Sequence, residues 1–599
     1  MRGSTTIRTP GSARRRSILS LVLVTALAAC ATEGGPGEVA CAVTDDRGQV
    51  ARCDVGVVAV AHPLAAEAGA EMLAQGGNAV DAAVAAGFAL AVVEPSMSGL
   101  GGRVQILIRA RDGSHHGIDG TTQAPSTYDP DTAPQASYGY PTVGVPGVPA
   151  GLLRALEEYG SLPRATVMAP AIRYASEGFE LLPGEAERHA GSVDMVREFE
   201  GTSRYFLNSD GNPRVAGELW VQEDLAATLR AIAEGGVDAF YRGPLAEAMV
   251  ADLQANGSAV TLESLAEYRA ETSEIVRDDY RGYDLVGLWI PSFGAITIHA
   301  LNLLETLPVA ELDEAEWTAA VAEAIHVAYL ERPNQSTLED ADRLVSDEYA
   351  SERASVMRLP EAMTGGATAD GGAPRGGVVR HAFAGETFDG EAVLPPSWLE
   401  EVGHTTHLTT ADDEGMVVAL TQTNGPSMGS RVASPGLGFL YAATLGGYLG
   451  RMEPGERARS HISPFMVERD GEPFLALGAA GGGRIPTAII AAVSRVVDQG
   501  MSLPDAVAAP RVVPAFGSQA DEGDPDAPRE IDVEIGTGFG FDDAVIEELR
   551  AMGYEVDATD REGAFGRIHA ARWHADLGVW EAVADPDWEG AAAVPGGDR

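Results

Sequence analysis

The sequence is short of positive charge. Arginine and lysine together number 42 against 88 aspartates and glutamates, so the formal net charge is -46. Because a field of that sign repels phosphate groups, binding of nucleic acid or of an anionic membrane through a basic face is excluded. We expect no nucleic-acid partner, and the acidic surface favours solubility in a salty exterior.

Apolar runs long enough to span a bilayer are absent near the N-terminus. The run at 18–29 is too short for a mature membrane helix; it follows three arginines at 14–16 and ends at Cys30. This order resembles a bacterial lipoprotein signal over 1–30, in which Cys30 is lipidated and becomes the mature N-terminus. An ordinary signal peptide cut nearby is the alternative. We expect export, with a lipid anchor as the sole membrane attachment, in the periplasm or at the cell surface.

Cysteine is scarce, with three in the chain. Once Cys30 is lipidated, Cys41 and Cys53 remain, and in an oxidising compartment they can close a small loop. Free thiols are the alternative. No histidine cluster accompanies them, which makes a metal site here a poor interpretation.

The residues after the signal divide into a tether over 31–54 and a folded body that begins near Val55. Within the body a segment at 365–390 is rich in glycine, alanine and aspartate without apolar periodicity, which is typical of an exposed, poorly ordered loop. Apolar positions three or four residues apart predict helices over 63–75, 79–93, 149–159, 225–234, 244–256 and 316–331. The first two helices are expected to lie side by side in one layer.

Two β-rich runs, at 405–410 and 416–423, are joined by a short polar segment and predict a hairpin. If Thr410 faces Met416, then Thr405 faces Thr421, and Thr423 points to the same side as Thr421. We therefore expect the side chains of Thr405 and Thr423 to approach each other. Taken alone, each threonine is explained equally well by the preference of threonine for strands.

A series of short segments then carries a resemblance over most of the chain: His62–Gly69, Gly76–Ala83, Glu94–Gly102, Val145–Val148, Tyr280–Tyr283, Thr405–His407 and Gly481–Arg484. In this order they resemble the gamma-glutamyltransferases (gamma-glutamyltranspeptidases), a family of N-terminal-nucleophile hydrolases. The resemblance implies an α+β fold, a four-layer αββα sandwich. It also implies a precursor that cuts itself between His404 and Thr405 into a large subunit, 55–404, and a small subunit, 405–599, which stay together.

In that scheme Thr405 is the catalytic nucleophile. Its hydroxyl needs a base, and the α-amino group freed by cleavage, with a reference pKa near 7.7 to 8.0, can take the proton at neutral pH. The resemblance makes Thr423 the residue that orients the nucleophile, and Gly481 and Gly482 the backbone N–H donors to the oxyanion. No cofactor is expected. No metal is expected either, because alternation along a strand sends the side chains of His404 and His407 to opposite faces.

The family's substrate-binding residues are altered. Thr121 stands where the family has a carboxylate-binding arginine, and Gly446-Gly447 stand where it has a pair of acidic residues. Where the family has a substrate-binding asparagine, this chain has Gly425, and an asparagine stands one position earlier, at Asn424. Where the family has two adjacent serines, this chain has Ser460-His461. The residues expected around substrate are Ser460, His461, Asn424, Thr121 and Arg103, with Arg103 and Arg459 as candidate replacements for the lost arginine.

Three functions follow from these observations. The first is a gamma-glutamyltransferase-like amide hydrolase or acyltransferase that acts on gamma-glutamyl compounds such as glutathione or on a related small acyl amide. The second is an acylase for a non-glutamyl amide, as in the related cephalosporin acylases. The third is a catalytically silent surface lipoprotein that binds a solute.

Overall fold

The computed structural model describes residues 41–360, 363, 404–515, 529–536, 538–561 and 565–596. The signal segment over 1–30 with Cys30, and the glycine-rich segment at 365–390, lie outside the described residues. Among the residues described, no helix has the length and apolar character needed to cross a membrane.

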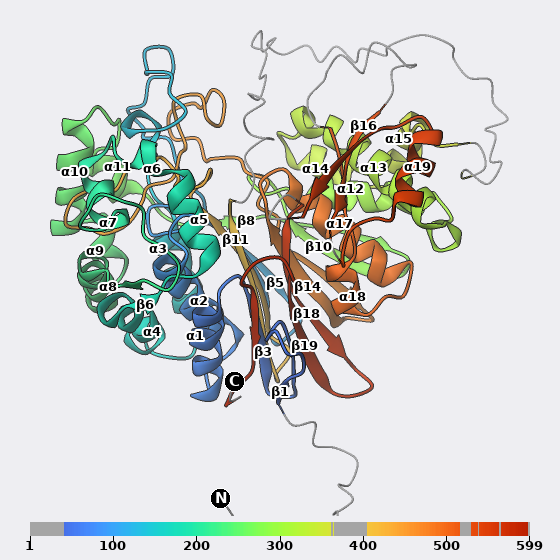
Figure 1. Ribbon diagram of the computed structural model, residues 1–599, viewed down its shortest axis with the longest axis horizontal. Coiled ribbons are helices and arrows are strands. Elements are labelled where there is room, and N and C mark those ends of the chain that lie inside the picture. Colours follow the sequence, from blue (N-terminus) through green and yellow to red (C-terminus); the bar gives the residue numbers. More distant parts are fainter. Residues whose placement is uncertain are drawn as a thin grey trace, which may run out of the picture. The chain divides into compact units, whose positions relative to one another are not determined.

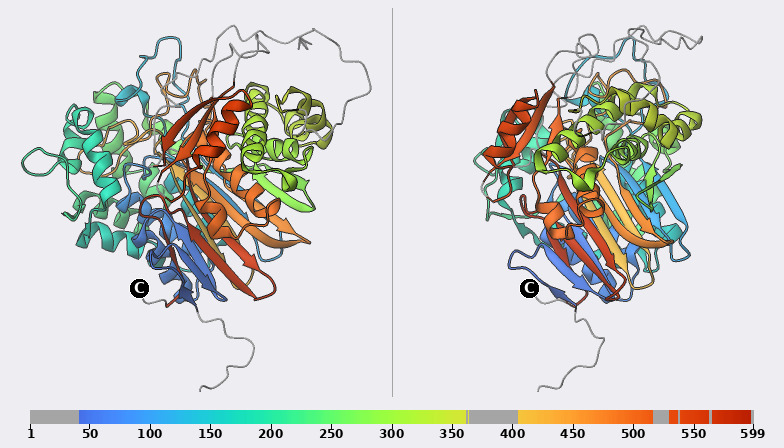
Figure 2. Two further views of the ribbon diagram at one scale, coloured as in Figure 1. Left: turned by 45° about the vertical axis from the view of Figure 1, so that its right-hand side comes forward. Right: turned by 90° about the vertical axis from the view of Figure 1, so that its right-hand side faces the viewer.

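Two large antiparallel sheets lie face to face in the middle of the described body (Figures 1 and 2). The seven-stranded sheet has the order β20 (Ala591–Ala593), β3 (Gly56–Val60), β11 (Thr406–Asp412), β12 (Val417–Thr423), β4 (Arg103–Arg109), β5 (His115–Gly120) and β8 (Glu271–Ser273). The eight-stranded sheet has the order β1 (Ala42–Val43), β2 (Val50–Cys53), β19 (Val579–Ala584), β18 (Arg567–His574), β14 (Glu472–Ala480), β13 (Phe465–Arg469), β10 (Tyr283–Leu288) and β9 (Ile275–Tyr280).

Helices cover the outer face of each sheet, so the layers run helix, sheet, sheet, helix (Figure 1). On the seven-stranded side are α1 (Pro63–Ala74), α2 (Ala79–Val93), α3 (Val148–Tyr159), α4 (Arg164–Glu177), α5 (Pro183–Gly191), α6 (Val193–Val196), α7 (Glu200–Phe206), α8 (Glu223–Gly235), α9 (Val237–Tyr241), α10 (Pro244–Ala255) and α11 (Leu262–Glu267). On the eight-stranded side are α12 (Gly294–Glu305), α13 (Glu314–Leu330), α14 (Leu338–Leu344), α15 (Asp347–Arg353), α17 (Arg484–Val497), α18 (Leu503–Ala508) and α19 (Asp543–Ala551). The helices predicted from apolar spacing are all confirmed within two residues at each end.

Smaller pairings complete the described structure: β15 (Val512–Pro514), β16 (Glu530–Ile535) and β17 (Glu555–Asp560) form one sheet, and β6 (Phe179–Glu180) pairs with β7 (Leu219–Trp220).

Helix α2 shows why the layers pack closely. Its N-terminus is fixed because the Asn78 side chain accepts hydrogen bonds from the backbone N–H groups of Val80 and Asp81, both at 3.0 Å. Every residue of α2 is buried, and most are alanine or valine, so the helix lies close against β11 and against α1. The prediction of two adjacent helices in one layer is confirmed.

Small side chains also let the two sheets approach each other. One shared core contains Ala59, Ala411 and Ala419 from the seven-stranded sheet and Ala476 and Ala571 from the eight-stranded sheet. The His407 ring lies between the two sheets, and a Cβ on Gly478 of β14 would lie 2.3 Å from the Cε1 atom of that ring. Glycine at 478 therefore makes room for the histidine.

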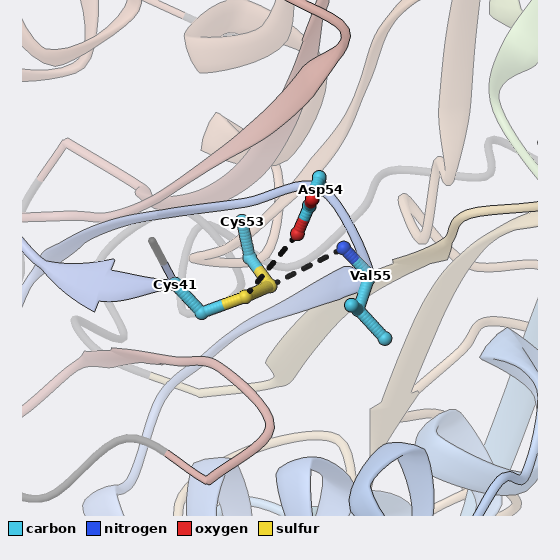
Figure 3. Close-up of a disulfide and its surroundings, with 4 residues drawn as sticks. All are labelled: Cys41, Cys53, Asp54 and Val55. Atoms are coloured by element: carbon cyan, nitrogen blue, oxygen red, sulfur yellow. Dashed lines mark hydrogen bonds between the residues drawn. A yellow bond between two sulfur atoms is a disulfide. The ribbon is translucent and has the colours of Figure 1, made fainter. Parts of the chain in front are cut away.

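The tether predicted over 31–54 is too long. Residues Ala42–Val43 and Val50–Cys53 form β1 and β2 at the edge of the eight-stranded sheet, and a disulfide joins Cys41 to Cys53 (Figure 3). The strand β2 is held because its residues pair with β19, where Ala51 lies opposite Ala582. The folded body thus begins before Val55.

The hairpin has a different register from the one predicted. Thr410 pairs with Val418 rather than Met416, because β11 continues to Asp412 and β12 begins only at Val417, after a four-residue loop in which Gly415 has φ +79°. The register therefore moves by two residues. A shift of two preserves which side chains share a face, and it brings Thr423 directly beside the start of β11.

Candidate active site

Thr405 immediately precedes β11 and has an unusual backbone. Its φ is +86°, a conformation that a β-branched residue adopts only at an energetic cost. The side chain is 3% exposed, and its Oγ1 hydroxyl donates a hydrogen bond to Thr423 Oγ1 at 3.0 Å. The structure thus brings together the two threonines that the hairpin pattern predicted.

Thr423 is the last residue of β12 and is itself fixed by the turn that follows. The backbone N–H of Gly425 donates to Thr423 Oγ1 at 2.9 Å. The Thr423 hydroxyl therefore accepts from Gly425 on one side and from Thr405 on the other. This pair of contacts sets the direction of the Thr405 hydroxyl.

A glycine turn after β14 faces the peptide bond between His404 and Thr405. The backbone N–H of Gly481 donates to the His404 carbonyl oxygen at 2.9 Å. The next glycine, Gly482, has φ +59°, and a Cβ there would lie 2.5 Å from His404 Cε1. The turn is thus shaped to hold a carbonyl oxygen beside a hydroxyl group.

Tyr329 of α13 supports this turn from the neighbouring helix layer, since its hydroxyl donates to the Gly483 carbonyl at 2.6 Å. Reasoning from the sequence missed Tyr329. The two residues are 154 positions apart, and no motif around Tyr329 indicated the contact.

The two histidines near Thr405 have separate environments. Burial lowers the pKa of His404 to about 4, with smaller contributions from the positive charges of Arg484 and Arg103, so the ring is neutral near pH 7. The ring of His407 lies between the sheets, hydrogen-bonded to Thr421 Oγ1 at 2.7 Å and Thr409 Oγ1 at 3.0 Å. The His404 ring lies against Gly482 and the His407 ring lies against Gly478, so the two rings occupy different sites.

A pocket opens beside the two threonines. Its lining residues are Arg103, His404, Thr405, Thr423, Gly425, Tyr448, Leu449, Ser460, His461, Gly482, Gly483 and Ile485. Three of the residues predicted to contact substrate are therefore present: Arg103, Ser460 and His461. Tyr448 was not expected, although it directly follows the glycines that replace the family's acidic pair.

Thr121 and Asn424 were also predicted to contact substrate, but neither lines this pocket. The Thr121 hydroxyl donates to Asp119 Oδ1 at 2.6 Å, so its side chain turns back on its own strand end. Asn424 donates from Nδ2 to the Pro95 carbonyl at 3.1 Å and is engaged with the loop before β4. Arg459 is likewise outside the lining; its side chain is 52% exposed and donates to the Gln335 carbonyl.

Comparison with known proteins identifies the family. The family model described as gamma-glutamyltranspeptidase matches residues 65–594. The chain belongs to the gamma-glutamyltranspeptidase family. It is accordingly an enzyme of this hydrolase and transferase family, and the glycine turn and the threonine pair both fall within the matched residues.

Relatives of this gamma-glutamyltranspeptidase-family chain are named for two kinds of activity. A glutathione hydrolase proenzyme of Pseudomonas sp. (strain A14) is 33% identical, with 76% of this chain and 81% of the relative aligned. An acylase ACY 1 proenzyme of Pseudomonas sp. (strain SE83) is 32% identical over 87% of this chain and 92% of the relative. The crystal structure of cephalosporin acylase from Bacillus halodurans superposes with a TM-score of 0.77 at 27% identity, covering 93% of this chain and 98% of that one. These similarities leave the substrate open.

Proposed function

We propose that this chain is a self-processing amide hydrolase or acyltransferase whose nucleophile is Thr405. The four-layer body would be made as one precursor and cut between His404 and Thr405, which gives a large subunit that ends at His404 and a small subunit over 405–599. One observation carries the proposal: the Thr405 hydroxyl is held by Thr423 next to a peptide carbonyl that already accepts a hydrogen bond from Gly481. The proenzyme names of two relatives add support.

In the self-cleavage step, Thr405 Oγ attacks the carbonyl carbon of His404. The carbon–nitrogen bond breaks, an ester forms between His404 and the threonine oxygen, and the α-amino group of Thr405 takes up the hydroxyl proton. Water then hydrolyses the ester and leaves a carboxylate on His404. The N–H of Gly481 points at the oxygen that becomes negative, and the positive φ of Thr405 favours leaving the starting conformation.

The same groups can serve an external substrate. The freed amine of Thr405 is the base, its hydroxyl attacks the substrate's amide carbonyl, and the glycine turn donates to the oxyanion. The amine product departs, which leaves an acyl ester on Thr405. Water or a second amine takes the acyl group, giving hydrolysis or transfer.

The substituted residues favour a substrate whose acyl group differs from the gamma-glutamyl group of glutathione. Thr121 and Gly447 replace the charged residues expected to hold the gamma-glutamyl carboxylate and ammonium, and neither lines the pocket. Loss of a bidentate ion pair from a buried site weakens the free energy of substrate binding by roughly 2 to 5 kcal/mol. An acylase of the kind named among the relatives fits these substitutions better than a glutathione hydrolase does.

We further propose export with a lipid on Cys30, from the arginines, short apolar run and cysteine at the N-terminus. Cells fed a radiolabelled fatty acid should incorporate label into the large subunit. Replacement of Cys30 by serine should abolish that label and release the protein from membranes, whereas label retained in the serine variant would contradict lipidation at Cys30.

Turnover of simple acyl 4-nitroanilides tests the catalytic proposal. The wild-type protein should run as two bands on a denaturing gel and release nitroaniline. Thr405→Ala should remain one uncut chain without turnover, while Thr405→Ser should retain cleavage, because a serine hydroxyl supplies the same nucleophile. A wild-type chain that stays uncut and binds small solutes without turning them over would instead favour the silent lipoprotein.

A further inference from the structure

Glu185 of α5 is a buried carboxylate outside the pocket beside Thr405, and both of its oxygens accept hydrogen bonds. The residue is 1% exposed and is not among the lining residues of that pocket. Its Oε1 atom accepts from the backbone N–H of Ser96 at 3.0 Å, and His189 Nε2 lies 3.0 Å from the same oxygen. Its Oε2 atom accepts from the Ser96 hydroxyl at 2.5 Å and from Arg188 Nη2 at 2.7 Å. The carboxylate therefore holds Ser96 by both its backbone and its side chain.

Glu185 keeps its negative charge near pH 7 in spite of its burial. Burial acts to raise its pKa, but the charge of Arg188 and the hydrogen bond with His189 outweigh burial and hold the pKa at about 2. Arg188 also donates from Nε to the Ser96 hydroxyl oxygen at 2.7 Å, so that hydroxyl is fixed from two sides. Because each of these contacts is buried and involves a charged group, the arrangement around Ser96 is costly to disturb.

Ser96 lies in the loop between α2 and β4, and the backbone of this loop holds the turn that follows β12. The Ser96 carbonyl accepts from the Met428 N–H at 2.7 Å. The carbonyl of Met97 accepts from the Asn424 N–H at 3.0 Å, and the carbonyl of Pro95 accepts from Asn424 Nδ2 at 3.1 Å. Three consecutive residues of the loop thus bind the turn through their carbonyl oxygens, and the central one is the residue that Glu185 fixes.

The turn after β12 in its turn fixes the hydroxyl that directs the nucleophile. Gly425, next to Asn424, donates its N–H to Thr423 Oγ1 at 2.9 Å, and the same oxygen accepts from the Thr405 hydroxyl at 3.0 Å. Buried hydrogen bonds, joined by short lengths of backbone, therefore connect Glu185 to Thr405. The loop precedes the bond between His404 and Thr405 in the chain and the turn follows it, so this connection would run from the large subunit to the small one.

We propose that Glu185 is a positioning residue for Thr405: it holds the loop between α2 and β4, and the loop holds the Thr423 hydroxyl where it directs the nucleophile. The inference rests on the proposed function, because it assigns a residue that acts on the same nucleophile. A misplacement of about 1 Å at a reacting group can cost on the order of 100-fold in rate. A loop that is no longer held would therefore slow the reaction, although Glu185 does not touch substrate.

Glu185→Gln keeps the size of the side chain but leaves one acceptor oxygen in place of two. The amide nitrogen then faces either the Ser96 N–H or Arg188, so one side of the network is lost whichever way the amide turns. We expect self-cleavage, followed in cell-free synthesis on a denaturing gel, to slow about tenfold. In the processed enzyme kcat for a simple acyl 4-nitroanilide should fall by a similar factor, with KM within about twofold of wild type. A wild-type cleavage rate, or an effect confined to KM, would overturn the proposal.

A double variant separates positioning from a general loss of structure. If Glu185 acts through the Thr423 hydroxyl, the two effects do not multiply: in a chain that already carries Thr423→Val, Glu185→Gln should slow cleavage by less than about twofold more. Multiplication of the two effects would refute the proposal. The matched control is Glu468→Gln, which neutralises another buried carboxylate, paired with Arg109 at 2.6 Å at the end of β4 away from Thr423. It should cleave at the wild-type rate, and equal slowing in this control would also refute a specific role of Glu185.

Ser96→Ala decides the question if the Glu185 variant does not fold. It removes only the hydroxyl contacts to Glu185 and Arg188. Cleavage should slow at least about threefold, the loss expected for one weakened hydrogen bond, and again by less than about twofold beyond Thr423→Val. An unchanged rate, or full multiplication with Thr423→Val, would overturn the proposal. A wild-type chain that stays uncut would refute the proposed function itself, whereas normal cleavage by both variants refutes the role of Glu185 alone.

Discussion

The hydroxyl of Thr423 is the most informative group to remove. Thr423→Val replaces it with a methyl group of similar shape at a site that is 2% exposed, so packing changes little. Two contacts are lost: the 3.0 Å hydrogen bond from Thr405 and the 2.9 Å hydrogen bond from the Gly425 N–H. The second loss leaves a buried donor unsatisfied and lowers the free energy of unfolding by roughly 1 to 3 kcal/mol.

The first loss affects self-cleavage. Without Thr423 Oγ1, the Thr405 hydroxyl is no longer directed, and we expect the cleavage rate to fall by about 10- to 100-fold, equivalent to roughly 1.4 to 2.7 kcal/mol in the barrier. Cell-free synthesis sampled over time on a denaturing gel measures this rate. Thr423→Ser keeps the hydroxyl and should cleave at close to the wild-type rate. Wild-type cleavage by the valine variant, or equal slowing in the serine variant, would refute the orienting role.

Three further perturbations concern the glycine turn, the buried His569 and the buried pair of Arg511 with Asp585. Gly482→Ala places a Cβ 2.5 Å from His404 Cε1 at a residue with φ +59°, so cleavage in the same assay should slow at least about tenfold; an unchanged rate would contradict the fit at the turn. Burial lowers the pKa of His569 to about 3, so only the unfolded chain takes up a proton as pH falls below about 6.5, and this contribution to stability is present at pH 7 and lost on acidification. Urea unfolding of the uncut precursor should therefore lose roughly 2 to 3 kcal/mol more between pH 7 and 4.5 than the same chain with His569→Asn, and equal losses would exclude this cause. Arg511→Met leaves the carboxylate of Asp585, now paired with Arg511 at 2.6 Å, buried without its partner, and should cost about 3 to 5 kcal/mol of unfolding free energy; a loss below 1 kcal/mol would show that the pair is dispensable.

The helices and the hairpin were accessible from the sequence because they rest on local patterns, whereas the four-layer arrangement was expected from the resemblance to the family. Apolar spacing predicted the helices, and two β-rich runs joined by a short polar segment predicted the hairpin that contains Thr405 and Thr423. The register was wrong by two residues because it depends on the loop conformation at Gly415, which the pattern of the strands does not contain. The pairing of β2 with β19 was missed for a similar reason, since strand pairing across the chain leaves little local signal.

The site was predicted less completely than the fold. Thr405, Gly481 and Gly482 belong to short motifs, and the structure brings them together. Arg103 could be named as a candidate, but its unused N–H groups depend on what surrounds it in space. The hydrogen bond that directs the Asn424 side chain to the Pro95 carbonyl, and so away from the pocket, could not be predicted from its position next to Thr423.

The position of the cut decides whether Thr405 becomes the N-terminal nucleophile. The chain contains no lysine, so an amine-directed reagent can label only free α-amino groups. After labelling and digestion on the C-terminal side of arginine, the account predicts a peptide that begins with labelled Thr405 and ends at Arg431. Recovery of an unlabelled peptide that runs from His381 to Arg431, or of a labelled α-amine at any other residue of this region, would contradict it.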